Sequence, residues 1–508
     1  MNRKIDAFSR KSAEKKDEVT TLKEAKPDTY FKGIVKILRR FQPGPTIIIV
    51  TDGTGVIEAV SKECEFDADE VVELAGFVEE RAGKLQIEIR HIEKSDVNFD
   101  LIIDSKSEPK KRELSIKSEK LNVLEPYFFS IAKRIRKAIF ENQPILIRHH
   151  ADADGITSGI AIEKACRGLM AELGIDAKFN IFRSPSKAPF YEIIDVLRDI
   201  SFTKKLIEGH GQKKPLIIVL DNGSTPEDVF AMKMLKTLGF DIIVIDHHNP
   251  VILNNKKTAV CPYVKLHLNP YIEGFNGKLS AGMLSYETAR LIFDDFENAL
   301  LPAISAVGDR CDNSEAEEYI ARSGLTKDEI TEKVIAIDFL AYHLKFDEAT
   351  EMYDEVFTNK DFVKMINEEV RKGVETQLQS TLPYLRTREL TGVIFSDIDL
   401  EKYTVRFKYP TPGKVIGMIH DEVAKEKEGP VITIGYLSDM IIIRATKPIL
   451  PIASIIEKLR HDFPEANVDG GGHECAGTIK FVSAHLTTII ESIKQQIRNL
   501  DYIKGEEE

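Results

Sequence analysis

The feature that most constrains this chain is an apolar, strand-like run that ends abruptly in histidine and aspartate. "QPILI" at 143–147 predicts a buried strand, and "RHHADADGIT" at 148–157 follows it directly. "KPLIIVLDNGS" and "DIIVIDHHNP" repeat the arrangement, and helical patterns separate the runs. This alternation predicts an α/β fold with a parallel sheet covered on both faces. Ligands of such sheets collect beyond the carboxyl ends of the strands, so we expect a site there.

Four apolar runs deliver candidate ligands to that edge, and we expect all four to be strands of one sheet. The fourth run is "LPAISAVGD", which ends at Asp309. The first three deliver His150, Asp152 and Asp154, then Asp221, then Asp246, His247 and His248. A single aspartate after a strand is commonly a helix N-cap. Four clusters together would repel one another and raise the carboxyl pKa values, and bound cations would remove that repulsion.

The mixture of carboxylates and imidazoles indicates which ions would bind. It suits Mn²⁺ and related divalent ions better than Ca²⁺, which prefers oxygen alone, or structural zinc, which favours cysteine. About seven candidate ligands are enough for two ions. A bridging Asp221 could hold such ions ~3.5–4 Å apart, the spacing used for displacement at phosphorus. The pattern therefore predicts a two-metal phosphoesterase.

The whole chain of 508 residues is long enough for about three domains at ~150 residues each, and its composition changes along its length. We expect a mobile charged tail at 1–27, an OB-like β-barrel at 28–104, a basic linker and helix at 105–142, the catalytic domain with a helical insert at 143–385, and a smaller α/β domain at 386–508. The segment "YTVRFKY" is expected to be one of the strands of this last domain.

The five cysteines are scattered along the chain, and we expect them to be reduced thiols. Neither a signal peptide nor a membrane-spanning run is apparent, so we expect a cytoplasmic protein without a membrane partner.

Five short motifs resemble those of a known superfamily. "HADADG", "VLDNGS", "VIDHHNP" and "AVGD", in that order, resemble the motifs of the DHH phosphoesterases. "GGGHECAG" resembles the glycine-rich motif of the DHH-associated domain. The resemblance covers about 144–500 and is strongest to the archaeal branch of the RecJ-like single-strand exonucleases. It implies a parallel-sheet DHH catalytic domain followed by a DHH-associated substrate-binding domain.

The resemblance also implies roles for individual residues. One metal ion would be held by His150, Asp152 and Asp221, and the other by Asp154, Asp221, His247 and Asp309. Asp246 would orient an imidazole, His248 would contact the scissile phosphate, and Gly470, Gly471, Gly472 and His473 would grip a phosphate, so that Asp221, Asp246 and His248 form the catalytic set. Two Mn²⁺ ions are favoured, with Mg²⁺ or Co²⁺ as alternatives.

One position departs from the superfamily pattern. Many relatives place a histidine four residues before the first aspartate, where this chain has Arg148. His149 and His150 lie closer, and because a strand alternates its faces, at most one of them should point into the site. We favour His150, and the sequence leaves His149 open.

The function favoured is hydrolysis of single-stranded DNA or RNA to 5′-mononucleotides, in replication, repair or RNA turnover. The first alternative is a phosphohydrolase for a small substrate: pyrophosphate, a cyclic dinucleotide or a very short oligonucleotide. The second is a non-catalytic scaffold of a replication complex. The resemblance also admits replication proteins such as GINS as partners. The sequence leaves the choice of DNA or RNA, the polarity and the oligomeric state open.

Overall fold

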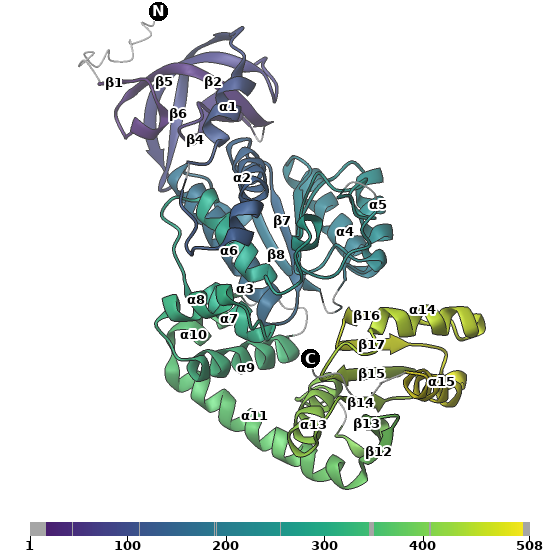
Figure 1. Cartoon of the computed structure of the whole chain (residues 1–508). Coiled ribbons are helices and arrows are strands. Elements are labelled where there is room, and N and C mark those ends of the chain that lie inside the picture. The colour runs from purple at the N-terminus through teal and green to yellow at the C-terminus, as the bar shows by residue number, and fades with distance from the viewer. Residues whose placement is uncertain are drawn as a thin grey trace, which may run out of the picture.

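The computed structural model describes residues 17–42, 44–110, 112–186, 188, 190–253, 256–344, 350–405 and 408–500. A β-barrel, a central α/β domain and a C-terminal α/β domain follow one another along the chain, and the long helix α11 leads to the last of them (Figure 1). Most of the expected charged tail, 1–16, lies outside the described residues. None of the helices described is long and apolar enough to cross a membrane.

The N-terminal barrel has five strands and closes on itself. The strands are β2 (Tyr30–Phe41), β3 (Thr46–Thr51), β4 (Val56–Ser61), β5 (Val71–Arg81) and β6 (Lys84–Lys94). They pair in the order β2-β3-β4-β6-β5, and β5 pairs again with β2. The pair β4–β6 is parallel and the others are antiparallel. The short strand β1 (Glu18–Val19) adds to β2. The predicted OB-like barrel is confirmed.

Helix α1 (Phe99–Ser107) begins inside the segment expected to be the barrel and ends in the basic linker, and α2 (Glu119–Phe140) forms the rest of the helical part of the linker. Apolar residues of α2, among them Leu121, Leu124 and Phe128, enter the core of the catalytic domain. Basic side chains of α2 pair within the chain: Arg134 Nη2 lies 2.9 Å from Asp241 Oδ2. Lys133 and Lys137 pair with acids of the preceding segment. Part of the positive charge of the linker is therefore used to hold the linker on its own protein.

The central domain contains a five-stranded parallel sheet in the order β11-β10-β9-β7-β8. The strands are β7 (Ile145–His150), β8 (Ile181–Ser186), β9 (Leu216–Leu220), β10 (Asp241–Ile245) and β11 (Leu266–Leu268). One face packs with α2, α3 (Ala153–Glu172) and α6 (Ala281–Ile292). The other packs with α4 (Ile193–His210) and α5 (Val229–Thr237). The predicted parallel sheet, covered on both faces, is confirmed.

The expectation of a fourth ligand-bearing strand is wrong. "LPAISAVG" lies in helix α7 (Leu300–Gly308), and Asp309 is its C-cap residue. A short continuous apolar run is compatible with a buried strand or a buried helix, and periodicity alone does not separate them. Contacts with α3 and α6 bury α7 and decide the outcome. The helical insert continues as α8 (Ser314–Ser323), α9 (Lys327–Leu344), α10 (Thr350–Thr358) and α11 (Lys360–Thr381).

The C-terminal domain has a six-stranded mixed sheet in the order β12-β13-β14-β15-β17-β16. The strands are β12 (Arg386–Leu390), β13 (Val393–Asp399), β14 (Val431–Tyr436), β15 (Met440–Ala445), β16 (Asp469–His473) and β17 (Ala476–Lys480). The helices are α12 (Leu400–Tyr403), α13 (Pro412–Glu426), α14 (Ile452–Asp462) and α15 (Leu486–Arg498). The predicted strand "YTVRFKY" is wrong where the structure describes it, because α12 ends there.

Candidate metal centre

The first group of candidate ligands lies where β7 passes into α3. His150 is the last residue of β7, and its Nδ1 lies 2.8 Å from Asp152 Oδ2. Asp152 is the N-cap of α3, where its Oδ1 accepts a hydrogen bond from Gly155 N at 3.0 Å. Asp221 Oδ2 lies 3.5 Å from the same nitrogen of His150. The three side chains could hold one metal ion.

Asp221 connects this group to a second one. It follows β9 and has φ 55°, a left-handed conformation that costs a non-glycine residue roughly 1–3 kcal/mol. A hydrogen bond from its backbone N to Ile245 O holds it there. The two oxygens of the Asp221 carboxylate have different neighbours: Oδ2 lies near His150, and Oδ1 lies 3.3 Å from His247 Nε2. Asp221 Oδ2 is buried and has no hydrogen-bond partner among the described residues, so this oxygen is available to a cation.

The second group consists of Asp154, His247 and Asp309. His247 Nε2 lies 3.0 Å from Asp309 Oδ2 and 3.5 Å from Asp154 Oδ2. The other ring nitrogen, Nδ1, lies 2.7 Å from Gly277 O. A carbonyl can only accept, so Nδ1 carries a hydrogen and Nε2 is the atom that faces the carboxylates. Histidine ligands of metals are commonly fixed in this way.

Charge at the centre favours a cation. Asp154 is buried and accepts hydrogen bonds from Ala281 N and Gly282 N, the first residues of α6. Burial, together with the carboxylates of Asp221 and Asp309, raises the pKa of Asp154 well above its ordinary value.

The same excess of negative charge changes the pKa values of the two candidate histidine ligands. Burial alone would lower the pKa values of His150 and His247, but neighbouring carboxylates outweigh it and raise both well above the ordinary value. Divalent ions would neutralise the same charge, and the oxygen and imidazole donors fit Mn²⁺, Mg²⁺ or Co²⁺.

Asp246 and His248 form a pair beside the ligands. His248 Nδ1 lies 2.7 Å from Asp246 Oδ1, which also accepts hydrogen bonds from His247 N and His248 N. The buried carboxylate thus fixes the His248 ring, and this geometry suits the orienting role that the family resemblance implies for Asp246. Burial lowers the pKa of His248, but Asp246 outweighs it, so that the pKa is raised.

The structure brings His150, and not His149, to the cluster. His149 is fully buried, with Nδ1 2.7 Å from His150 O and Nε2 2.9 Å from Arg183 Nη1. Arg148 lies on the face of the sheet opposite to His149 and forms buried ion pairs with Asp199 and, at 3.7 Å, with Asp195 of α4. Arg148 therefore links β7 to α4 and makes no contact with the ligands.

A cavity of about 430 Å³ separates the ligand groups from the glycine-rich hairpin of the C-terminal domain. It is lined by His150, Asp152, Asp221, His248 and Asp309 on one side, and by Arg444, Gly470, Gly471, Gly472, Thr478 and Lys480 on the other. Gly472 has φ 144°, and a Cβ there would lie 2.3 Å from Ala476 O. Only glycine therefore fits at position 472 of this hairpin. The side chain of His473 lies outside the described part of the structure.

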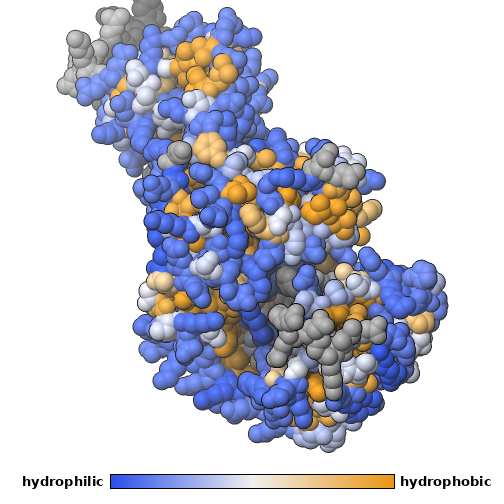
Figure 2. Space-filling view, in the orientation of Figure 1, coloured by the Kyte–Doolittle hydropathy of each residue, from blue (hydrophilic) through white to orange (hydrophobic). Residues whose placement is uncertain are grey.

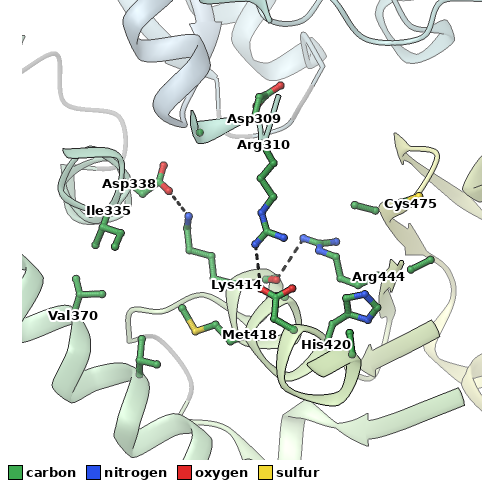
Figure 3. Close-up of a pocket in the computed structure, with 18 of the residues that line it drawn as sticks. Asp309, Arg310, Ile335, Asp338, Val370, Lys414, Met418, His420, Arg444 and Cys475 are labelled. Atoms are coloured by element: carbon green, nitrogen blue, oxygen red, sulfur yellow. Dashed lines mark hydrogen bonds and ion pairs between the residues drawn. The ribbon is translucent and has the colours of Figure 1, made fainter. Parts of the chain in front are cut away.

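A larger cavity of about 1350 Å³ begins at Asp309 and runs between the helical insert and the C-terminal domain. Figure 2 shows the surface hollowed along this boundary. Arg310, Lys414 and Arg444 point into it (Figure 3). Lys414 of α13 forms an ion pair with Asp338 of α9. This ion pair joins the C-terminal domain to the helical insert. Sequence analysis missed Lys414, Arg444 and Lys480, because isolated cations in unrelated segments carry no spacing signal.

Comparison with known proteins identifies the superfamily. The model of the DHH family, N-terminal domain, matches residues 144–300. A solved structure described as "Member of s1p family of ribosomal proteins PF0399 DHH domain" has TM-score 0.76 and 35% sequence identity, covering 79% of this chain and 97% of that one. The chain belongs to the DHH phosphoesterase superfamily. The expected resemblance is thereby confirmed.

Further matches include one uncharacterized protein and two RecJ proteins. The uncharacterized protein MJ1198 of Methanocaldococcus jannaschii is 36% identical over 510 residues, 90% of this chain and 67% of that protein. The single-stranded-DNA-specific exonuclease RecJ of Bacillus subtilis is 27% identical over 203 residues, 39% of this chain and 23% of that protein. RecJ of Thermus thermophilus, solved with Mn²⁺, shares the fold, with TM-score 0.51, 15% identity, and 77% and 56% of the two chains covered.

Proposed function

We propose that this DHH protein is a two-metal exonuclease that removes 5′-mononucleotides from single-stranded DNA or RNA. The observation that carries the proposal is the pair of neighbouring ligand groups: Asp221 of the first lies 3.3 Å from His247 of the second, and residues of both groups line one cavity. Divalent ions bound there would activate water and neutralise the phosphoryl oxygens. The Bacillus subtilis relative, a single-stranded-DNA-specific exonuclease, supports the substrate class.

Each ligand group would hold one ion. His150, Asp152 and Asp221 would bind the first. Asp154, Asp221, His247 and Asp309 would bind the second. Mn²⁺ is favoured, because three carboxylates with one imidazole suit a borderline cation. With Asp221 in both sets, the two ions would lie next to each other and could neutralise the charge of one phosphate.

His248 would contact the scissile phosphate. Asp246 fixes the ring of His248 through Nδ1, and His248 lines the cavity beside Asp221 and Asp309. The raised pKa of His248, caused by Asp246 against the opposing effect of burial, favours the protonated ring that binds an anion best. Asp246 acts through His248 and is a positioning residue.

The C-terminal domain would bind the substrate from the opposite side. Backbone N–H groups of Gly470, Gly471 and Gly472 can approach a phosphate closely, and Arg444 and Lys480 add positive charge. A cavity of about 430 Å³ lies within the ~300–1,000 Å³ of small-molecule sites. It suits one terminal nucleotide rather than a duplex, and the strand that follows would occupy the larger cavity.

The experiment is digestion of end-labelled single-stranded DNA and RNA with Mn²⁺, comparing the wild type with Asp221→Ala. The control is Asp439→Ala, which changes an exposed aspartate of the C-terminal domain. We expect stepwise release of mononucleotides by the wild type and the control, and none by Asp221→Ala. The same gels report polarity and sugar preference.

Two other outcomes would contradict the proposal. If long strands survive while pyrophosphate or dinucleotides are cleaved, the protein is a phosphohydrolase of small substrates. If nothing is cleaved although calorimetry shows Mn²⁺ binding that requires Asp221, it is a non-catalytic scaffold.

A further inference from the structure

The cavity at the metal centre contains one large apolar side chain that the proposed chemistry at phosphorus does not use. Phe190 lines this cavity of about 430 Å³ together with the metal ligands and the glycine-rich hairpin. The other lining residues are polar, or are glycine and alanine. Phe190 is therefore the only large apolar residue among the described residues that line the cavity. Because the ions, His248 and the hairpin would bind a phosphate, the ring is left for a different part of the substrate.

The loop that carries Phe190 starts beside the metal ligands. β8 is the strand next to β7, and its last residue, Ser186, is paired with His150 of β7. Phe190 lies in the loop between Ser186 and α4, which begins at Ile193. Phe190 therefore lies at the carboxyl edge of the sheet, on the side of the cavity where His150 lies.

The next residue, Tyr191, fixes this part of the loop. Tyr191 is buried in the core between the sheet and the helices α4 and α5. Its backbone N donates to Asp228 Oδ1 at 2.7 Å, and its hydroxyl donates to Asp199 of α4. Phe190, by contrast, is only partly buried, and it borders the cavity. The buried neighbour thus holds an accessible aromatic residue at the cavity wall.

A lysine of the opposite domain shows which way the ring faces. Lys480 Nζ, from β17 of the C-terminal domain, lies over the Phe190 ring, 5.9 Å from its centroid. A cation is attracted to the face of an aromatic ring, where the ring is electron-rich. One face of the ring is therefore turned across the cavity towards the hairpin. Lys480 is exposed and has a flexible side chain, so its ammonium group can move from the ring to a bound phosphate.

A nucleobase fits this ring face better than the other parts of a nucleotide. Every base has a flat π-face, and bases of single strands stack on aromatic side chains with little dependence on sequence. The phosphate would instead be bound by Arg444, Lys480 and the backbone N–H groups of the hairpin. A sugar has no flat face to stack.

We propose that Phe190 is the platform on which the base of the terminal nucleotide stacks while its phosphate lies at the metal centre. The inference rests on the proposed function and deepens it, because it names the residue that recognises the base. The terminal base of a duplex is already paired and stacked, so the platform favours an unpaired end. Pyrophosphate has no base and would gain nothing from Phe190.

The test is calorimetric titration of the full-length protein in Mn²⁺ with adenosine 5′-monophosphate and with ribose 5-phosphate, which lacks the base. We expect the nucleotide to bind the wild type about five- to 150-fold more tightly, the range for stacking on an aromatic side chain. Phe190→Ala should remove this preference without weakening the binding of ribose 5-phosphate. Phe190→Tyr keeps a ring and should retain the preference.

The matched control is Phe179→Ala. Phe179 is 44% exposed and also has a lysine over its ring, with Lys178 Nζ 5.6 Å from the centroid. It precedes β8 and therefore lies at the edge of the sheet opposite to the metal centre. Its substitution should leave the binding of both ligands unchanged. Circular dichroism of each variant checks that the fold is retained.

Three results would overturn the inference: neither ligand binds at millimolar concentration, both bind the wild type equally, or the preference for the nucleotide survives Phe190→Ala. The exonuclease assay reports separately on the proposed function. If strands are degraded although the two ligands bind equally, the exonuclease function stands and the base platform is wrong. If the preference requires Phe190 but no strand is degraded, the cavity binds a mononucleotide and the exonuclease function is wrong.

Discussion

His267 of β11 gives the stability of this protein a defined dependence on pH. Its ring is buried, with Nε2 2.8 Å from Ser224 Oγ and Nδ1 3.2 Å from Thr258 Oγ1. Burial lowers the pKa of His267 to about 4, against an opposing effect of Asp246. Between pH 6.5 and about 4, the unfolded chain binds a proton that the folded chain excludes. The stabilisation is therefore complete above pH 6.5 and is lost as the pH falls towards 4. The difference amounts to ~3 kcal/mol at ~1.36 kcal/mol per pKa unit.

The perturbation is His267→Gln, which keeps a neutral donor and acceptor near Ser224 and Thr258. Urea denaturation in EDTA, followed by far-ultraviolet circular dichroism, gives the free energy of unfolding at pH 7 and pH 4.5. The stability advantage of the wild type over the variant should shrink by about 2–3 kcal/mol between these pH values. His461→Gln, at an exposed position, is the control. An advantage that stays constant with pH would refute the reasoning.

Three further predictions concern the metal centre, the sheet and the hairpin. Mn²⁺ at 100 times its dissociation constant should stabilise the wild type by ~2.7 kcal/mol for each ion bound and Asp221→Ala much less, measured as a rise in the melting temperature that EDTA reverses. Arg148→Met should cost ~3–5 kcal/mol in urea denaturation, because it leaves Asp199 buried without its cation, and a cost below ~1 kcal/mol would contradict this. Gly472→Ala should lower kcat/KM on single strands at least tenfold with unchanged Mn²⁺ affinity by calorimetry, since its Cβ would meet Ala476 O at 2.3 Å and displace the hairpin.

The local sequence pattern was sufficient to predict the parallel sheet and to place most of the candidate ligands at its carboxyl edge. His150, Asp221 and His247 each follow an apolar run, and the carboxyl ends of parallel strands meet at one edge of a sheet. Strand order and direction therefore bring residues together that lie about a hundred positions apart in the chain. The alternation of strand faces indicated that at most one of His149 and His150 points into the site, and the structure places His150 beside Asp221.

Local pattern failed where a segment is compatible with two structures. "LPAISAVG" is apolar throughout, and only its packing against α3 and α6 makes it the helix α7. Asp309 still reaches His247, because the C-terminus of α7 ends at the same edge of the sheet. Asp309 therefore lies at the expected edge of the sheet, but it comes from a helix and not from a strand.

The sequence by itself determined the fold class and the chemistry of the sheet edge, because periodicity and strand-end residues are local properties of the chain. Only the tertiary structure decided what faces that edge. Arg444, Lys414 and Lys480 reach the cavities because the C-terminal domain packs against the helical insert. Single polar residues in distant segments have no spacing to detect, and their proximity arises only when the domains pack.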